Sequence, residues 1–208
     1  MRHFLRPNFF ANTPDILPEF LQMDGRPAFL QRLVLAATLS PSYGIYSGFE
    51  LCENEAMPGS EEYADSEKYQ LRPRDFQRPG NLNAFLGRIN TIRRENPALL
   101  RNDTLRFHPT DNEQIIFYSK TAPDHSNVLL VVVNLDPHHV QHGWVEVPLG
   151  ELGLREDESY QMHELLGDGR FLWQGRRNYV RLDPQESPAQ IFRVRRRVRT
   201  EHDFDYYL

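Results

Sequence analysis

Apolar residues recur with two different periods along the chain, and the period changes near residue 101. Before that point, the segments 27–39 and 82–95 place apolar residues three or four positions apart, which predicts two helices. Pro27 suits the first turn of the earlier helix, and Pro97 marks the end of the later one.

Two short apolar runs, one ending at Phe10 and one over residues 41–51, predict strands in this first part. Residues 52–80 then form a polar loop, acidic at first and basic later. Loops of more than about 15 residues inside a compact domain are commonly functional or disordered. The order strand, helix, strand, loop, helix is typical of a parallel α/β fold with about two repeats, too few to close a barrel.

After residue 101 the apolar runs become short and rich in β-branched and aromatic residues, with turn clusters such as Gly167-Asp168-Gly169 between them. Seven such runs are TLRFHPT, QIIFYSKT, NVLLVVVNL, GWVEVPL, ESYQMHELL, NYVRLDP and AQIFRVRR. About seven strands at this spacing predict an antiparallel β-sandwich. We therefore expect an α/β domain over residues 1–101, an all-β domain over 102–196 and a tail over 197–208.

The stretch FFANTPDILPEF, residues 9–20, allows two interpretations. In the first, Thr13 caps a helix, Pro14 occupies its first turn, and Asp15 lies near the positive end of the helix dipole. In the second, a strand ends at Phe10 and the following loop presents Asp15 at the mouth of an active site. Capping statistics alone favour the first interpretation.

Composition argues against several classes of protein, among them nucleic-acid-binding and membrane proteins. The 208 residues are 39% hydrophobic and 25% charged, which is an ordinary globular mixture, and the net charge of −5 gives no reason to expect nucleic acid or an anionic membrane as a partner. No apolar run approaches the roughly 18 residues that span a bilayer. Cys52 is the only cysteine, which excludes an internal disulfide and fits a reducing cytoplasm.

Three further signals favour structural interpretations. PHHVQH, residues 137–142, could bind zinc through its histidines, but a polar hairpin turn is the stronger interpretation because no cysteine or carboxylate cluster is near in sequence. RVRRRVRT, residues 193–200, predicts a solvated edge strand rather than a nucleic-acid site. Trp144 and Trp173 could stack on sugars, but we expect both to be buried in the sandwich.

FFANTPDIL also resembles the late barrel motif of the α-amylase superfamily, in which an Asn and an Asp end the seventh barrel strand; Thr13-Pro14 replaces the usual histidine of that motif. Together with RPAFLQRLVLAATLSPSYGIYSGFEL and PGSEEYADSEKYQLRPRDF, it is similar to one branch, the maltose-1-phosphate maltosyltransferases. The match runs from about residue 2 to residue 100 and is looser in the sandwich half. The resemblance implies the last part of a (β/α)₈ TIM barrel, followed by an antiparallel β-sandwich domain.

The resemblance assigns Asp15 as the carboxylate that stabilises the transition state of a retaining mechanism. Such a transition state resembles an oxocarbenium ion, so a fixed carboxylate binds it better than the ground state. The resemblance further assigns Lys68 and Tyr69 to contacts with the donor sugar and places Asn12 in the same site. From the residues alone, the loop around Lys68 and Tyr69 would be a solvated charged segment.

The family's nucleophile and general acid lie earlier in the barrel, so these 208 residues alone are expected to be inactive. The resemblance implies α-maltose 1-phosphate and α-1,4-glucan as substrates of the complete enzyme, a homodimer, and no metal or organic cofactor, because the donor has its own leaving group. Two alternatives stay open: a non-catalytic glucan-binding β-sandwich module, and a maltose-acting hydrolase or isomerase of the superfamily. We also expect the apolar stripes of the two predicted helices to lack partners.

Overall fold

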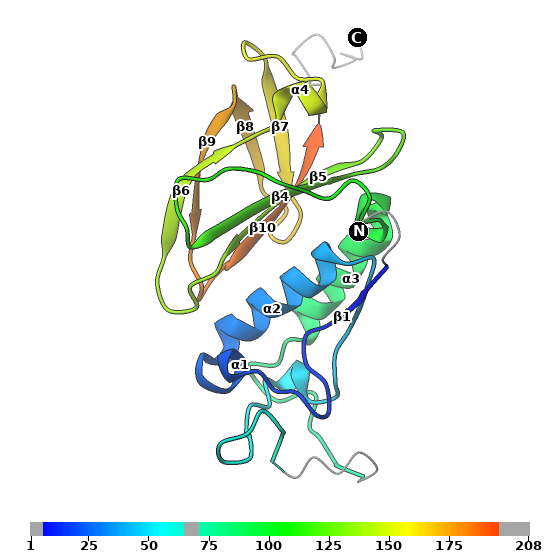
Figure 1. Ribbon diagram of the computed structural model, residues 1–208, viewed down its shortest axis with the longest axis vertical. Helices are drawn as coiled ribbons and strands as arrows, with labels where there is room; N and C mark the ends of the chain where they lie inside the picture. The colour runs from blue at the N-terminus through cyan, green and yellow to red at the C-terminus, as the bar shows by residue number, and fades with distance from the viewer. Residues whose placement is uncertain (1–5, 65–70, 196–208) are drawn as a thin grey trace, which may run out of the picture.

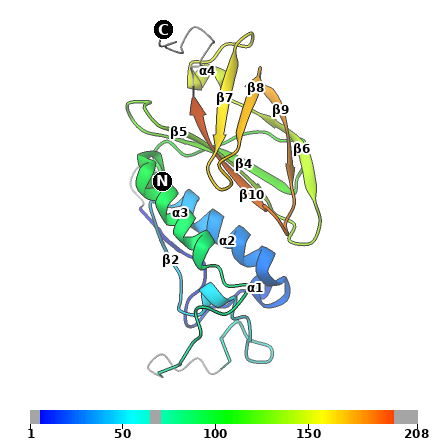
Figure 2. The same cartoon turned by 180° about the vertical axis from the view of Figure 1, so that it is seen from behind.

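The computed structural model describes residues 6–64 and 71–195 (Figures 1 and 2). Its N-terminal part pairs two short parallel strands and adds three helices. These elements are β1 (Asn8–Phe10), α1 (Glu19–Met23), α2 (Gly25–Leu39), β2 (Ser42–Gly44) and α3 (Asn83–Glu95), with 3₁₀ helices at Phe49–Leu51 and Pro97–Leu100. The two predicted helices and the strand ending at Phe10 are confirmed, whereas the strand predicted over residues 41–51 is limited to Ser42–Gly44. Residues 52–64 and 71–80 of the predicted loop are irregular, and residues 65–70 lie outside the described residues.

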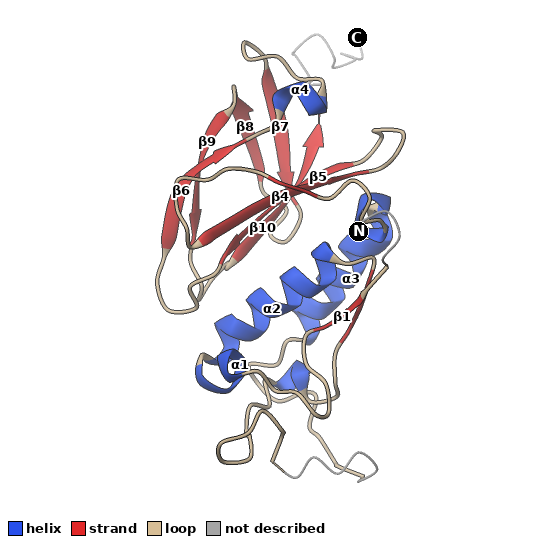
Figure 3. Cartoon of the chain, in the orientation of Figure 1, coloured by secondary structure: helices blue, strands red, loops and turns tan. Residues whose placement is uncertain are grey.

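The C-terminal part consists of two antiparallel sheets (Figure 3). The larger sheet has the strand order β3-β4-β5-β10-β7-β8, and the smaller sheet pairs β6 with β9. The strands are β3 (Arg106–Phe107), β4 (Ile115–Thr121), β5 (Val128–Asn134), β6 (Gln141–Glu146), β7 (Ser159–Glu164), β8 (Arg170–Gln174), β9 (Arg177–Leu182) and β10 (Ala189–Arg195); a short helix, α4 (Leu149–Leu152), follows β6.

All seven predicted strands are present, and the structure adds β8, which the sequence analysis missed. The prediction of an edge strand over residues 193–200 is wrong for residues 193–195, and residues 196–200 lie outside the described residues. β10 pairs with β5 on one side and with β7 on the other, so it lies inside the sheet and the two edges are β3 and β8. The local sequence could not show this because the order of strands depends on partners far away in the chain.

Two hydrophobic cores lie on the two faces of the six-stranded sheet. Side chains of β5 alternate between them: Leu129, Val131 and Val133 face α2 and α3, whereas the neighbouring apolar residues on β5 face β6 and β9. β5 is buried along its whole length for this reason. The strand therefore appears in the sequence as a continuous apolar run, although its pairing is antiparallel.

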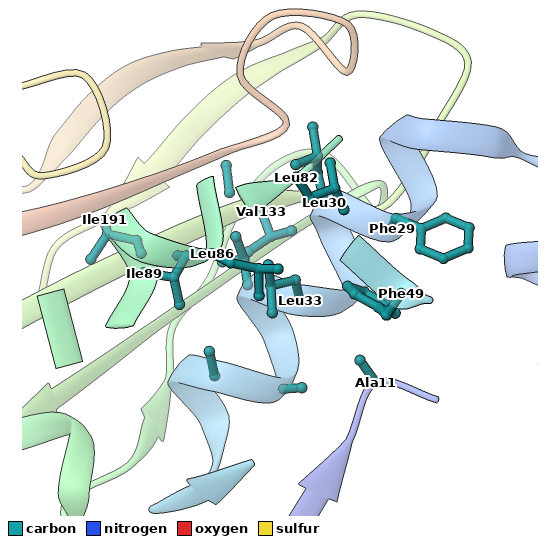
Figure 4. Packing of buried hydrophobic residues seen from close by; sticks show 14 of the residues in the cluster. Ala11, Phe29, Leu30, Leu33, Phe49, Leu82, Leu86, Ile89, Val133 and Ile191 are labelled. Atoms are coloured by element: carbon teal, nitrogen blue, oxygen red, sulfur yellow. The ribbon is translucent and has the colours of Figure 1, made fainter. Parts of the chain in front are cut away.

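α2 lies between the β1–β2 pair and the six-stranded sheet (Figure 1). Figure 4 shows Leu33 of this helix close to Val133 of the sheet and to Leu86 of α3. Because α2 contacts layers on opposite sides, ten of its fifteen residues are buried and it is apolar around most of its circumference. Two polar residues of α2 are also buried: Thr38, whose hydroxyl is hydrogen-bonded to Val34 and Tyr118, and Gln31, which is taken up below.

The expectation of unpartnered helix stripes is wrong. Leu82, Leu86, Ile89 and Ile92 of the α3 stripe are all buried, and only Phe85 is partly exposed. The six-stranded sheet covers these helices.

Parallel pairing between the described strands is confined to β1 and β2, so the origin of this part in a (β/α)₈ barrel stays a prediction. The division into domains at residues 1–101 and 102–196 also stays a prediction. Within residues 6–64 and 71–195, no helix has both the length and the apolar character needed to cross a membrane.

Candidate functional site

Asp15 lies in a tight turn just beyond β1, not in a helix. The backbone N–H of Thr13 donates to the carbonyl of Ile16 at 3.1 Å, and the N–H of Ile16 donates back to Thr13 at 3.4 Å. Pro14 and Asp15 are the two central residues of this turn, a place that proline's fixed φ suits. The helix-capping interpretation is therefore wrong, because α1 begins only at Glu19, whereas the strand ends at Phe10 as the second interpretation expects. The Asp15 side chain is exposed.

Asn12 connects the ends of both parallel strands to the loop that follows. Its side-chain oxygen accepts a hydrogen bond from the backbone N–H of Tyr46 at 2.8 Å, and its Nδ2 donates to the hydroxyl of Tyr63 at 2.5 Å. The amide is 2% exposed, so both of its polar atoms are engaged in a buried network. Asn12 thus fixes the backbone at the carboxyl ends of β1 and β2, the edge where open α/β sheets bind ligands.

Tyr46 and Tyr63 form an aromatic pair beside Asn12, with ring centroids 5.7 Å apart and planes inclined at 56°. Burial raises the pKa of Tyr63 to about 12, and the hydrogen bond from Asn12 opposes this increase. The Tyr63 phenol therefore stays neutral at physiological pH.

A bidentate ion pair closes the loop around these rings. Arg74 donates to Glu53 from Nε at 2.9 Å and from Nη2 at 3.1 Å. This hydrogen bonding to Glu53 is the main reason that the pKa of Arg74 is raised above its usual value. Gly48 lies against the pair with φ of +102°, and a Cβ there would come within 2.2 Å of a Glu53 oxygen. Only glycine suits this position.

An open pocket of about 270 Å³ lies beside this network. Its lining is mostly polar, and includes Glu53, Glu55, Tyr63, Arg72 and Arg78. The backbone N–H of Leu17 donates to the carbonyl of Glu61 at 2.5 Å, which ties the chain just after the Asp15 turn to the same loop. The arrangement has hydrogen-bond donors and acceptors and a phenolic ring, the groups that polyhydroxylated ligands need.

Sequence reasoning located part of this network. Lys68 and Tyr69 lie outside the described residues, and the structure does not test the assignment of Asp15 and Asn12 to a site. The contributions of Tyr46, Tyr63 and the Glu53–Arg74 pair were missed. A tyrosine inside the acidic run SEEYADSEKYQ was the only local signal for Tyr63.

The histidine-rich turn makes polar contacts within the chain. His138 Nε2 lies 3.0 Å from Asp24 and His139 Nδ1 lies 2.9 Å from Asp136. Over the described ranges, no group of three or more His, Cys, Asp or Glu side chains is arranged to hold a metal ion.

The two tryptophans differ in solvent exposure. Trp173 is 7% exposed, as predicted, but the prediction of a buried Trp144 is wrong because this ring is 43% exposed on β6. β6 and β9 form the outer layer of the fold and no described segment covers them, so alternate residues face solvent.

Solved structures with a similar backbone identify the fold. An α-amylase from Anoxybacillus superposes with a TM-score of 0.66 at 14% identity, over 94% of this chain and 40% of that one. An α-amylase from Malbranchea cinnamomea gives a TM-score of 0.60 at 17% identity, over 89% and 36%. At such identities the likeness concerns the fold alone, and the chain has the fold of a part of the α-amylase-like proteins.

Sequence comparison is more specific. Residues 107–194 match the family described as GLGE, C-terminal. An α-1,4-glucan:maltose-1-phosphate maltosyltransferase from Rhodospirillum rubrum is 55% identical over 92% of this chain, and one from Myxococcus xanthus is 51% identical over 98%. The chain is therefore a homologue of the C-terminal region of these maltosyltransferases. It spans 28% and 30% of the length of these two relatives.

Proposed function

We propose that this chain forms the C-terminal part of a retaining transferase that moves maltosyl from α-maltose 1-phosphate to the non-reducing end of an α-1,4-glucan and releases phosphate. The observation that carries the proposal is the identity of 51–55% to the two named maltosyltransferases over more than nine-tenths of this chain. At that identity, the positions of the Asp15 turn and of the buried Asn12 network are expected to correspond to those of the relatives.

Asp15 is the transition-state stabiliser in this proposal. The turn after β1 places this carboxylate at an exposed position, and the backbone bonds between Thr13 and Ile16 limit the movement of the turn. A carboxylate held in place before the reaction stabilises the positive charge of an oxocarbenium-like transition state without reorganising.

In this proposal Lys68 and Tyr69 contact the donor sugar, and Asn12 supports the same site without contacting the sugar. Lysine donates hydrogen bonds to sugar hydroxyls, and tyrosine offers both a ring face and a hydroxyl. Asn12 contributes by positioning Tyr63 and the backbone of Tyr46, because its own polar atoms are already engaged.

The nucleophile and the general acid are expected outside these 208 residues. Retaining chemistry needs two carboxyl groups about 5 Å apart across the glycosidic bond. Glu53 is held by Arg74 and is a poor substitute for either. The proposal therefore includes an upstream barrel portion, a homodimer in the complete enzyme and no required cofactor.

The proposal is tested by joining this chain to the region that precedes the matching segment in the Rhodospirillum rubrum relative, and by measuring phosphate release from α-maltose 1-phosphate with glycogen as acceptor. We expect activity in the joined protein and none in the 208-residue chain alone. Asp15→Asn should lower kcat by roughly 10²- to 10³-fold. The matched variant Glu19→Gln, an exposed acid four residues later, should leave kcat unchanged.

Phosphate release from the 208-residue chain alone, or full activity of the Asp15→Asn protein, would contradict the proposal. The same assay separates the alternatives within the superfamily. A hydrolase would release maltose or glucose from glucan in the absence of any phosphorylated donor, and an isomerase would interconvert disaccharides without releasing phosphate.

A further inference from the structure

The smaller sheet has an outward face on which aromatic and polar side chains alternate in register. Trp144 of β6 lies directly opposite Tyr179 of β9. On either side of this pair, His142 faces Arg181 and Glu146 faces Arg177. These six residues are called the aromatic face below. Gly143 and Val145, between them on β6, point inward.

We propose that the aromatic face binds α-1,4-glucan chains through stacking of sugar rings on Trp144 and Tyr179. The ring centroids of these two residues are 5.6 Å apart and their planes are inclined at 69°. Tyr179 also lies 5.9 Å from the ring of His142. Three neighbouring rings on an outer strand pair form a continuous aromatic surface.

Cross-strand pairing alone does not account for this surface. Aromatic pairs do stabilise sheets, but Trp144 and Tyr179 remain 43% and 50% exposed, so a large part of each residue is open to water. The Arg177 guanidinium, 5.5 Å from the centre of the Trp144 ring, holds the indole in one orientation. Solvent-exposed aromatic rings of fixed orientation reduce the entropy that a ligand loses on binding.

The charges around the rings favour a neutral ligand with many hydroxyls. Arg177 lies 3.4 Å from Asp111, and Arg181 lies 3.5 Å from Asp183. Because each cation of the aromatic face has a carboxylate partner, the face has no excess positive charge to attract nucleic acid or phosphate. The same groups supply donors and acceptors beside the rings, which suits the hydroxyls at the edge of a pyranose whose apolar C–H face stacks on the indole.

The choice of an α-1,4-linked chain rests on the function proposed above. The outward residues from His142 to Glu146 extend over about 13 Å, at roughly 3.3 Å for each residue, which is longer than one sugar ring. Rings inclined at 69° suit the curved path of an α-linked chain better than the flat ribbon of a β-linked one. Figure 1 places β6 and β9 on the side of the six-stranded sheet away from α2 and β1, so this surface is separate from the Asp15 turn.

The test is native gel electrophoresis of the 208-residue chain in gels that contain soluble starch, dextran, hydroxyethylcellulose or no polysaccharide. We expect retardation by starch and none by dextran or hydroxyethylcellulose. Trp144→Ala and Tyr179→Ala should each weaken binding roughly tenfold or more. The matched control is Phe171→Ala on β8, since Phe171 is also 43% exposed but lies outside the aromatic face, and its retardation should equal that of the unsubstituted chain.

A second measurement needs no substitution. Trp173 is 7% exposed, so Trp144 should account for most of the fluorescence that acrylamide quenches in the unsubstituted chain, and maltoheptaose should protect it. Unchanged quenching, unchanged retardation of the Trp144 and Tyr179 variants, or equal retardation by hydroxyethylcellulose would each overturn the inference. Asp15→Asn should lower phosphate release in the joined protein but leave retardation of the 208-residue chain by starch unchanged. Failure of glucan binding at the aromatic face can therefore be distinguished from failure of the proposed transferase activity.

Discussion

The side-chain amide of Asn12 donates a hydrogen bond to the hydroxyl of Tyr63, fifty-one residues further along the chain, inside a buried network. This bond joins the end of the first strand to the long polar loop. Both residues are almost completely buried, at 2% and 4% exposure, so water cannot replace either partner.

Tyr63→Phe should therefore destabilise the protein by about 1–2 kcal/mol, because it leaves a buried Asn12 N–H without an acceptor. Tyr43→Phe is the matched control. Tyr43 also bonds to an asparagine, Asn90, at 2.6 Å, but at an exposed position where water can replace the phenol, so its loss should cost less than about 0.5 kcal/mol. Urea unfolding measures both values, and equal costs would contradict the burial argument.

Lys120 should titrate near neutral pH. Its ammonium donates to the carbonyl of Leu99 and to Asn102, both at 3.1 Å, and its side chain is completely buried. Burial, assisted by Arg93 and opposed by Asp103, lowers its pKa to about 7 from an ordinary value of 10.5. Lys68 and Lys120 are the only lysines in the sequence, so selective ¹⁵N labelling of lysine should give two side-chain signals, one with a midpoint near pH 7.

The sign of the linked stability change follows from the same shift. Between pH 7 and 10.5 the unfolded chain holds a proton on this amine that the folded chain has lost, so the free energy of unfolding should rise with pH. The slope from this one group is at most about 1.4 kcal/mol for each pH unit. Lys120→Met should remove that contribution, and a slope that is identical in both proteins would disprove the assignment.

Gln31→Leu should stabilise the protein by about 1 kcal/mol. The Gln31 side chain is 1% exposed, and neither its Nε2 nor its Oε1 has a hydrogen-bond partner among the described residues. An apolar residue of similar size removes the cost of a buried amide without a partner.

Gln22 provides the opposite case for comparison. Its Nε2 donates to the carbonyls of Leu17 at 2.8 Å and Ser60 at 3.2 Å, so Gln22→Leu should cost about 1 kcal/mol or more. Thermal or urea midpoints of the two variants should move in opposite directions. A decrease in stability for Gln31→Leu would show that the amide is satisfied in solution.

Gly48→Ala should be far more damaging than Gly59→Ala. Both glycines have positive φ, +102° and +73°, and the backbone strain of alanine there is of order 1–3 kcal/mol in each case. A Cβ at Gly59 would meet nothing within 4 Å, whereas one at Gly48 would meet Glu53 and displace it from Arg74. The difference between the two free energies of unfolding measures this clash, and equal values would contradict it.

The spacing of apolar residues predicted most of the helices and strands, because that spacing reflects which side of each helix or strand is buried. The segments 27–39 and 82–95 form α2 and α3 to within two residues, and every apolar run after residue 101 forms a strand. RFLWQ, which forms β8, was missed because four of its five residues are exposed and its apolar residues do not alternate with polar ones. Such an edge strand depends on its neighbour, β7, rather than on its own sequence.

The site was predictable only in part. The resemblance placed Asp15 beyond a strand end, and the structure agrees on that position. It gave no information on Tyr63 or on the Glu53–Arg74 pair, because these contacts join residues that are 21 to 51 positions apart. Exposure of Trp144 was mispredicted because a sequence cannot show that its strand pair belongs to an outer layer of two strands.

The hydrophobic core between the helices and the six-stranded sheet is continuous. It includes Ala11, one residue after β1, and Ile191 in β10, the last described strand. α2 contacts β1 on one side and β5 on the other, and β5 pairs with β10, so this helix lies between the two ends of the described chain. Packing residues as far apart in sequence as Ala11 and Ile191 requires a large loop to close, so this core should be completed late in folding.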